Sequence, residues 1–138
     1  MTERLEKEFL QACLAAGKRI LEMKDAVVVH HFDADGLSAG AILFSAMLKN
    51  GVAPAMVCWK KTTMENVLEL KNRKEKQVVI ADLAYNPLLV EHLQEKEVII
   101  LDHHEVDPTP IPENFTLVNA HSYGIDGGIE VSGGGTSY

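Results

Sequence analysis

The chain has 138 residues, a net charge of −7 at pH 7 and two cysteines, Cys13 and Cys58, without zinc-knuckle or disulfide-scaffold spacing. This length fits one domain, residues 1–138, and the negative charge argues against a broadly basic nucleic-acid-binding surface. Because no signal peptide or membrane span is recognisable, we expect a cytoplasmic protein with buried free thiols and no membrane partner.

The N-terminal half of the chain alternates helix and strand patterns. Apolar residues recur at helical spacing over residues 3–23, which predicts an amphipathic helix. A buried strand is predicted at Ala26–His31, followed by a second helix. The predicted apolar stripe of that helix consists of Leu37, Ala41, Phe44 and Leu48. A second strand at Pro54–Trp59 and a helix over Met64–Asn72 follow.

The second half continues the alternation. Strands are predicted at Gln77–Ala81, Glu97–Leu101 and around Thr116–Val118. A helix is expected to begin at Pro87 because proline is favoured in the first helical turn. The charge cluster Lys71–Lys76 is interpreted as a solvated helix end and loop. Together these elements predict an α/β fold, a doubly wound and mainly parallel sheet of about five strands flanked by helices.

Acidic and histidine side chains follow three of the predicted strands. They are Asp33 and Asp35 with His31, then Asp82, and finally Asp102 with His103 and His104. Right-handed crossovers place the carboxyl ends of parallel strands at one edge, where ligands bind. Carboxylate and imidazole ligands suit Mn²⁺ or Mg²⁺, and such cations let an acidic protein bind phosphates. Two ions roughly 3.5–4 Å apart would neutralise the crowded carboxylates and acidify a bridging water into a hydroxide nucleophile.

Three motifs, HHFDADGLSAG, IADLA and LDHH, resemble in order the first three motifs of the DHH phosphoesterase superfamily. The resemblance covers about Val27 to His104, with a looser match from Asn119 to Tyr138. The DADG form of the first motif is most similar to RecJ-like and archaeal members. The resemblance implies a metal-dependent hydrolase, of the exonuclease or phosphodiesterase type, that cleaves phosphodiester bonds of nucleic acid or short oligonucleotides. Its expected partner is single-stranded nucleic acid, and no oligomeric state is predicted.

The resemblance also implies how two ions are held. His31 and Asp33 would hold one ion, whereas Asp35 and His103 would hold the other. Asp82 would bridge both ions. Taken alone, Asp33 and Asp35 would be expected to cap a helix and Asp82 to cap the next segment, but the other motifs favour the metal role.

Catalytic and phosphate-binding roles follow from the same resemblance. Asp102 would orient the histidines, and His104 would face the substrate phosphate. The implied catalytic set is Asp82, Asp102, His103 and His104. Ser38, in a helix start built of small residues, and the glycines Gly133, Gly134 and Gly135 are expected to help bind phosphate. The glycine run is equally compatible with a disordered terminus.

Other polar and aromatic residues receive simpler interpretations. His30 adjoins His31 on the opposite face of the strand and is expected to pack. Trp59 is expected in the core, although Trp59, Lys60 and Lys61 together could contact bases and phosphates.

Family members continue beyond the glycine-rich loop into a helix, a fourth motif whose aspartate completes the second metal position, and a separate C-terminal substrate-binding domain. We therefore expect this chain to be a fragment with an incomplete site, whose own activity is open. Asp126, in GIDGG, is better explained by a turn than as a substitute for that aspartate.

The sequence motifs are also compatible with several alternative functions. The same motifs fit an exopolyphosphatase, a hydrolase of cyclic dinucleotides or other small phosphoesters, or a non-catalytic DHH-type binding subunit. A more remote alternative is a haloacid-dehalogenase-like phosphatase with Asp33 as nucleophile and Asp35 as acid/base. That class expects Ser or Thr and then Lys after later strands, where this chain has Asp82 and Asp102.

Overall fold

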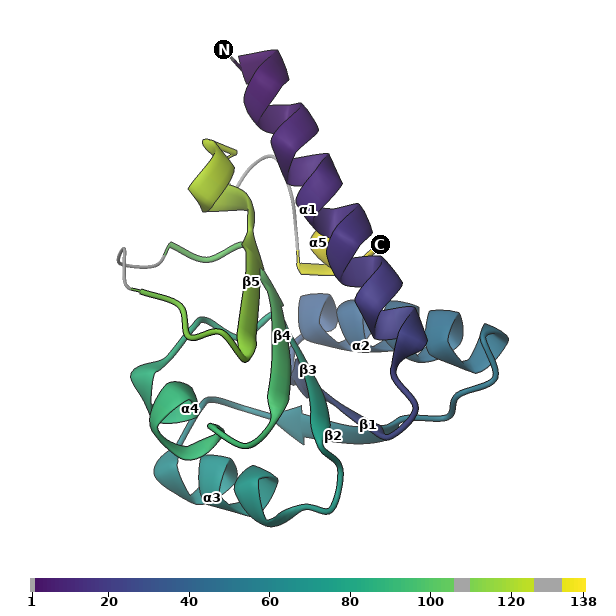
Figure 1. Ribbon diagram of the computed structural model, residues 1–138, viewed down its shortest axis with the longest axis vertical. Helices are drawn as coiled ribbons and strands as arrows, with labels where there is room; N and C mark the ends of the chain where they lie inside the picture. Colours follow the sequence, from purple (N-terminus) through teal and green to yellow (C-terminus); the bar gives the residue numbers. More distant parts are fainter. Residues whose placement is uncertain (1, 106–109, 126–132) are drawn as a thin grey trace.

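The computed structural model describes residues 2–105, 110–125 and 133–138. Its centre is a five-stranded, all-parallel sheet in the order β2-β1-β3-β4-β5 (Figure 1). The strands are β1 (Ala26–His31), β2 (Ala55–Trp59), β3 (Gln77–Ala81), β4 (Glu97–Asp102) and β5 (Phe115–Asn119). The helices are α1 (Thr2–Glu22), α2 (Ala34–Lys49), α3 (Met64–Asn72), α4 (Pro87–His92), the 3₁₀ helix η1 (Ala120–Tyr123) and α5 (Gly133–Ser137). The predicted α/β class and parallel sheet are confirmed.

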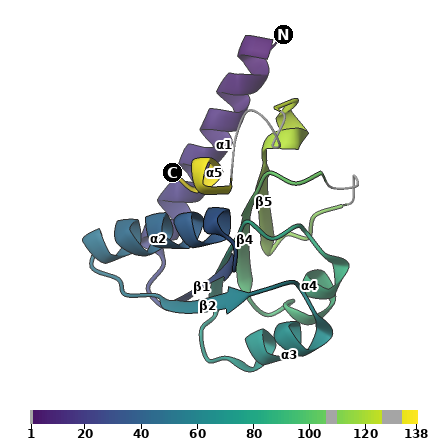
Figure 2. The ribbon, with the colours of Figure 1, turned by 180° about the vertical axis from the view of Figure 1, so that it is seen from behind.

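Two hydrophobic cores lie on opposite faces of the sheet. Because side chains alternate along a strand, Val28 and Val79 pack with α1 and α2, whereas Val27 and Val78 pack with α3 and α4. Figure 2 shows these helix pairs on either side of the strands. None of the described helices is both long and apolar enough to cross a bilayer.

The apolar stripe predicted for α2 is wrong, because it does not coincide with the face of the helix that is buried. Leu37 and Leu48 are 53% and 51% exposed. The residues of α2 that are buried are Gly36, Ala39, Gly40, Leu43 and Met47. Hydrophobicity alone selected the larger leucines, but the sheet-facing positions near the amino end of α2 are occupied by the smallest residues.

Close packing of α2 on β1 explains those small residues. A Cβ atom on Gly36 would lie 2.2 Å from the carbonyl oxygen of His31. A Cβ atom on Gly40 would lie 2.9 Å from ring carbons of His30, whose side chain is buried as predicted. The glycines therefore hold the start of α2 against the carboxyl end of β1.

The predicted burial of both thiols is not confirmed. Cys13 is only partly buried and Cys58 is exposed, and both are free. Cys58 lies on β2, which is at the edge of the described sheet next to β1 and has alternate side chains open to solvent. Trp59, at the end of the same strand, is 4% exposed and belongs to the core as expected.

The charge cluster after α3 is less solvated than predicted. Glu75 is 5% exposed and accepts two hydrogen bonds from the Arg73 guanidinium, at 2.9 and 3.1 Å. This pairing lowers the pKa of the Glu75 carboxyl. The buried Lys96 ammonium donates to the carbonyl of Arg73 at 3.0 Å. The amino ends of β3 and β4 are therefore joined by a buried polar network.

Candidate metal centre

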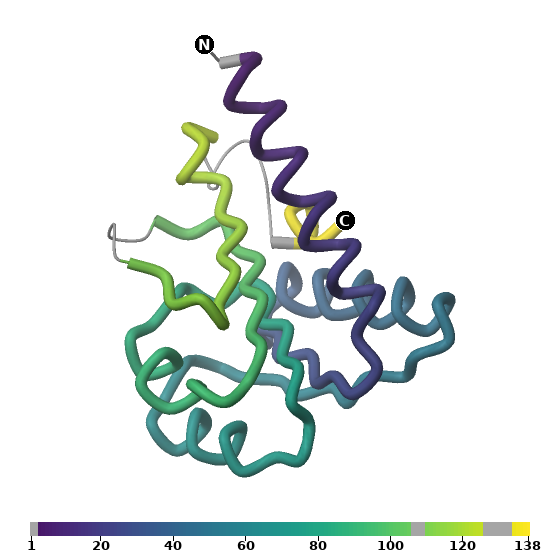
Figure 3. The backbone as a smooth tube through the Cα atoms, in the orientation of Figure 1, coloured from purple at the N-terminus to yellow at the C-terminus, as the bar shows by residue number. Residues whose placement is uncertain are grey.

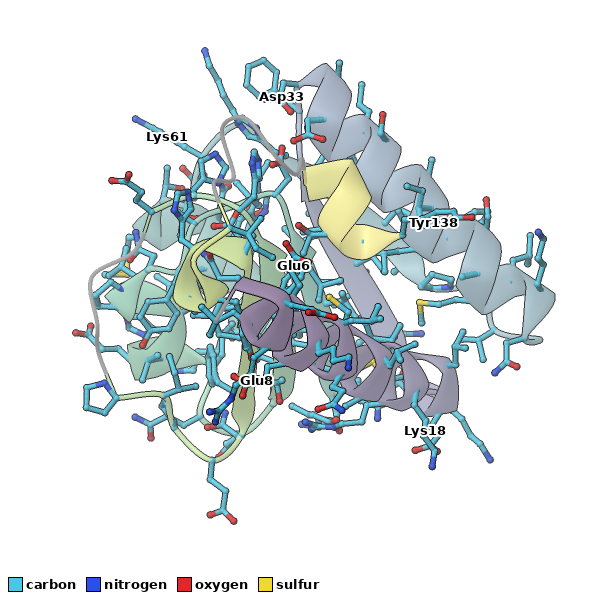
Figure 4. The ribbon with its side chains drawn as sticks, turned by 90° about the horizontal axis from the view of Figure 1, so that it is seen from above. Glu6, Glu8, Lys18, Asp33, Lys61 and Tyr138 are labelled. Carbon is cyan, nitrogen blue, oxygen red and sulfur yellow. The ribbon has the colours of Figure 1, made fainter. Side chains whose placement is uncertain are left out.

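The candidate site lies where the strand order changes direction. The chain moves from β1 outward to β2, then returns to the other side of β1 to form β3, so β1 and β3 flank the topological switch point. Ligand crevices of open α/β sheets form outside the carboxyl ends of such strands. His31 ends β1 and Asp82 directly follows β3. Figure 4 shows Asp33 at the amino end of α2, close to α5.

A first group of ligand atoms comes from His31, Asp33 and Asp82, whose candidate atoms all lie within 4.8 Å of one another. His31 Nδ1 lies 3.0 Å from Asp33 Oδ2 and 3.6 Å from Asp82 Oδ2. His31 Nε2 lies 3.0 Å from the carbonyl oxygen of Lys60. A carbonyl can only accept a hydrogen bond, so we assign the proton to Nε2 and a lone pair to Nδ1.

This His31 nitrogen is an orphaned polar atom. Within the described part of the chain, buried Nδ1 has no hydrogen-bond partner of acceptable geometry. Its lone pair faces carboxylate oxygens of Asp33 and Asp82, an arrangement that is repulsive unless a cation lies between them. The donor set therefore fits a metal ion.

A second group is centred on His103. Its Nε2 lies 2.8 Å from Asp82 Oδ1 and 3.2 Å from Asp35 Oδ2. The two oxygens of Asp82 therefore face different histidines, with Oδ2 toward His31 and Oδ1 toward His103. All five residues predicted to hold two ions are brought together, and Asp82 lies between the two sets.

His104 and Asp102 form a pair beside this second group. His104 Nδ1 donates to Asp102 Oδ1 at 2.6 Å, and Asp102 is fully buried. Asp102 Oδ2 has no hydrogen-bond partner among the described residues, and Asp102 also offers an atom to the group formed by Asp82, His103 and His104. Asp102 therefore contacts His104 directly, and its role in orienting the histidines, which the resemblance implies, stays a prediction.

Asn119 supports this turn and was not identified from the sequence. It is buried at the end of β5, opposite Asp102 in the strand register. Its side-chain Nδ2 donates to the carbonyl of His104 at 2.8 Å, and its Oδ1 accepts from the N–H of His121. Its position could have been noticed in the sequence, because a polar residue at the end of an apolar strand is the same pattern that identified Asp82.

Electrostatics distinguish Asp82 from Asp33. Burial is the main cause that raises the pKa of Asp82 from 3.8 to about 6. The charges of Asp35 and Asp33 act in the same direction, and the His103 hydrogen bond acts against them. Asp33 differs because its Oδ1 caps α2, accepting from the N–H of Gly36 at 2.8 Å, and this bond lowers the pKa of its carboxyl. Asp33 thus performs the capping role while its second oxygen faces His31.

The backbone of Asp82 is unusual. Its φ of 60° is in the left-handed region, which non-glycine residues seldom adopt and aspartate tolerates better than most. Its N–H donates to the carbonyl of Leu101 at 3.0 Å, which ties the turn to β4. Such local strain is typical of functional positions held by their surroundings.

The predicted phosphate contacts lie in different surroundings. Ser38 is exposed on α2, and its hydroxyl donates to the carbonyl of Ala34 within the helix. Gly133–Gly135 begin the short helix α5, which packs against α2 (Figure 3), and the N–H of Gly134 donates to Asp35 Oδ1 at 2.9 Å. These roles in phosphate binding stay predictions. Asp126 lies outside the described residues.

A pocket of about 310 Å³ opens beside the centre. His31, Asp82 and His104 line one side of it, and residues 60–62 and 83–86, which follow β2 and β3, line the rest. The centre therefore has room for a ligand next to the candidate metal ligands. The lysines here were considered on sequence grounds only together with Trp59, which proves to be buried.

Comparisons with solved structures agree on the fold. No family model matches the chain. An uncharacterised protein of Methanocaldococcus jannaschii is 28% identical over 146 residues, covering 100% of this chain and 33% of that protein. The crystal structure of exonuclease RecJ bound to manganese superposes with a TM-score of 0.71 at 24% identity, covering 94% of this chain and 35% of that chain. A DHH domain from a protein described as belonging to a family of ribosomal proteins gives a TM-score of 0.68 at 19% identity, covering 98% and 38%.

The chain spans only about a third of the length of these proteins, between 33% and 38%. The similarity extends over nearly all of the present chain.

Proposed function

The chain has the fold of the DHH domain found in RecJ, and from this premise we propose that it is a phosphoesterase domain that uses two divalent cations to hydrolyse phosphodiester bonds of nucleic acid or short oligonucleotides. The observation that carries the proposal is the position of Asp82, whose two carboxylate oxygens face separate histidines, His31 and His103. A carboxylate shared between two histidine-containing groups is what a two-metal site requires.

The chemistry of the donors supports Mn²⁺ as the resident ion, with Mg²⁺ as the alternative. The set contains carboxylates and imidazoles without thiolates, a combination suited to these ions rather than to structural zinc. RecJ, which shares the fold, is described with manganese bound.

Each residue would have a defined task in hydrolysis. Bound divalent ions supply an acidified water and stabilise charge on the phosphoryl oxygens. Asp33 would hold an ion together with His31, Asp35 would hold an ion together with His103, and Asp82 would contribute one carboxylate oxygen to each group. His104 donates Nδ1–H to Asp102, so its Nε2 is left for the substrate, and in the imidazolium form it can donate a hydrogen bond to a phosphate oxygen.

The experiment compares the wild-type chain with Asp82→Asn. We expect the wild type to bind Mn²⁺ with a stoichiometry above one in calorimetric or electron paramagnetic resonance titrations, and to cleave a 5′-phosphorylated dinucleotide. Asp82→Asn should lose at least one bound ion and the cleavage. Asp25→Asn is the matched control, because this exposed carboxylate precedes β1 at the opposite edge of the sheet.

Two results would refute the proposal. One is the absence of Mn²⁺ binding by the wild type, and the other is identical binding by wild type and Asp82→Asn. Normal Mn²⁺ binding without cleavage, together with retained oligonucleotide binding, would favour the non-catalytic binding subunit instead.

A further inference from the structure

The pocket beside the metal centre has two walls that metal binding does not explain. One wall carries Lys60 and Lys61, which follow β2. The other is formed by residues 83–86, which follow β3 and include Leu83 and Tyr85. The first wall is cationic and the second is largely apolar.

Strand register fixes the lysine wall against a candidate metal ligand. His31 lies opposite Trp59 in the pairing of β1 with β2, so Lys60 follows at the same edge. The carbonyl oxygen of Lys60 accepts the Nε2–H of His31 at 3.0 Å. The Lys60 ammonium lies 6.0 Å from the centre of the Phe32 ring, within reach of a cation–π interaction.

These lysines carry positive charge without a carboxylate partner. Within the described ranges, no carboxylate oxygen lies within 4.0 Å of the Lys60 or Lys61 ammonium. In Figure 4, Lys61 extends outward on the side of the molecule where Asp33 lies. With cations in the metal centre, the pocket would have positive charge on two sides, which favours an anionic ligand between them.

The second wall suits a nucleoside. Tyr85 is half-buried and packs against the core to which Leu83, only 5% exposed, belongs, so this wall offers an aromatic ring with apolar residues behind it rather than charges. A volume of about 310 Å³ is at the lower end of the range of small-ligand pockets, about 300–1,000 Å³. This space suits a single nucleotide unit better than a duplex.

We propose that this pocket binds the nucleotide adjacent to the scissile phosphate, with Lys60 and Lys61 contacting its phosphate and residues 83–85 contacting its sugar and base. The proposal rests on the proposed function, because the scissile phosphate is placed at the metal centre. Such a pocket would favour substrates that have nucleosides between their phosphates. A bare polyphosphate would use the lysines but gain nothing from Leu83 and Tyr85.

Equilibrium binding tests both walls. The probe is a 5′-phosphorylated thymidine dinucleotide with a phosphorothioate linkage and a 3′ fluorophore, measured by anisotropy with Mn²⁺ present. We expect the double variant Lys60→Ala/Lys61→Ala to weaken binding by about 10- to 100-fold, as for one or two lost charge-assisted contacts. The control Lys71→Ala/Lys74→Ala removes the same charge from exposed positions at the end of α3 and just after it, and should bind like the wild type.

Substitutions of Tyr85 distinguish binding of a nucleotide from binding of a polyphosphate. Tyr85→Ala should weaken the dinucleotide about tenfold, in line with the loss of one base–aromatic stacking contact. It should leave competition by tripolyphosphate unchanged, and Tyr85→Phe should restore dinucleotide binding. Equal effects of Tyr85→Ala on both ligands, or no effect on either, would overturn the assignment of a nucleoside.

Mn²⁺ titration separates failure of this inference from failure of the proposed function. Lys60→Ala/Lys61→Ala should bind Mn²⁺ as the wild type does, since the contact with His31 is made by the backbone carbonyl of Lys60, which the substitution keeps. Normal Mn²⁺ binding with undiminished dinucleotide affinity in this variant would overturn the pocket assignment alone. A wild-type chain that binds no Mn²⁺ would overturn the proposed function itself.

Discussion

Replacing Asp82 by asparagine should stabilise the metal-free protein at neutral pH, although it removes a predicted ligand. Burial and two neighbouring carboxylates raise the Asp82 pKa from 3.8 to about 6. A shift of about two units corresponds to roughly 3 kcal/mol of unfavourable free energy for the ionised form in the folded state. Asp82 is 2% exposed, so solvent screens little of this cost.

The pH dependence has a defined sign. Because the folded-state pKa is raised, the folded protein binds this proton more tightly than the unfolded chain does. The stabilising contribution is fully present below the unfolded pKa of 3.8 and is lost as the pH rises through about 6. The substituted asparagine would remain neutral throughout, so the advantage of Asp82→Asn should be absent near pH 4, grow as the pH rises between the two pKa values, and be complete above about pH 6.

Urea unfolding in EDTA at pH 4 and pH 8 measures this effect. We expect Asp82→Asn to be more stable than the wild type by about 2–3 kcal/mol at pH 8. Asparagine also tolerates the positive φ, whereas Asp82→Ala adds backbone strain of about 1–2 kcal/mol and serves as a comparison. An Asp82→Asn variant less stable than the wild type at pH 8 would refute the reasoning. Added Mn²⁺ should reverse the order by stabilising only the wild type.

Three further substitutions test the packing around the centre, each by urea unfolding. Gly36→Ala should unfold or severely destabilise the protein, because the new Cβ would lie 2.2 Å from a backbone atom. Gly17→Ala is the control: its Cβ would have nothing within 4 Å, so the change should be neutral or stabilising by about 0.5–1 kcal/mol. Equal effects of the two substitutions would contradict the close approach of α2 to β1. Glu75→Ala should cost about 1–3 kcal/mol because it strips a partner from the buried network after α3, and a surface-like cost near zero would argue against that burial. Asn119→Ala should cost about 1–3 kcal/mol and lower dinucleotide binding by releasing the carbonyl of His104, so a fully retained binding constant would exclude this supporting role.

The strands and the convergence of the site were predictable because both depend on simple patterns. Runs such as QVVIA and EVIIL are apolar after their first residue, as is typical of strands covered on both faces, and β3 begins and ends where predicted. Polar residues at the ends of such runs meet at one edge once the sheet is parallel. The contacts of His31, Asp82 and His103 follow from that geometry.

The predictions that failed concern the buried face of α2 and the burial of Glu75 and Cys58, and all of them depend on how segments distant in the sequence pack together. The stripe of α2 was misassigned because a close approach of helix to strand requires glycine, which hydrophobic patterns do not recognise. Burial of Glu75 and exposure of Cys58 depend on which chain segments end up at the amino edge and the lateral edge of the sheet. The sequence offered Lys60 and Lys61 only as possible phosphate contacts together with Trp59. Their position beside His31 could not be predicted, because it depends on β2 and β1 being neighbours in a given register.

The contact between Gly134 and Asp35 also bears on how the protein is made. These two residues are 99 positions apart, and the other members of the centre end β1 or closely follow β1, β3 and β4. During synthesis from the N-terminus, the first two aspartates would leave the ribosome long before His103 and the α5 glycines could reach them. Such non-local pairing is slow to form, so the centre should be completed among the last steps of folding. Acquisition of tight Mn²⁺ binding would then serve as a kinetic marker of the fully folded chain.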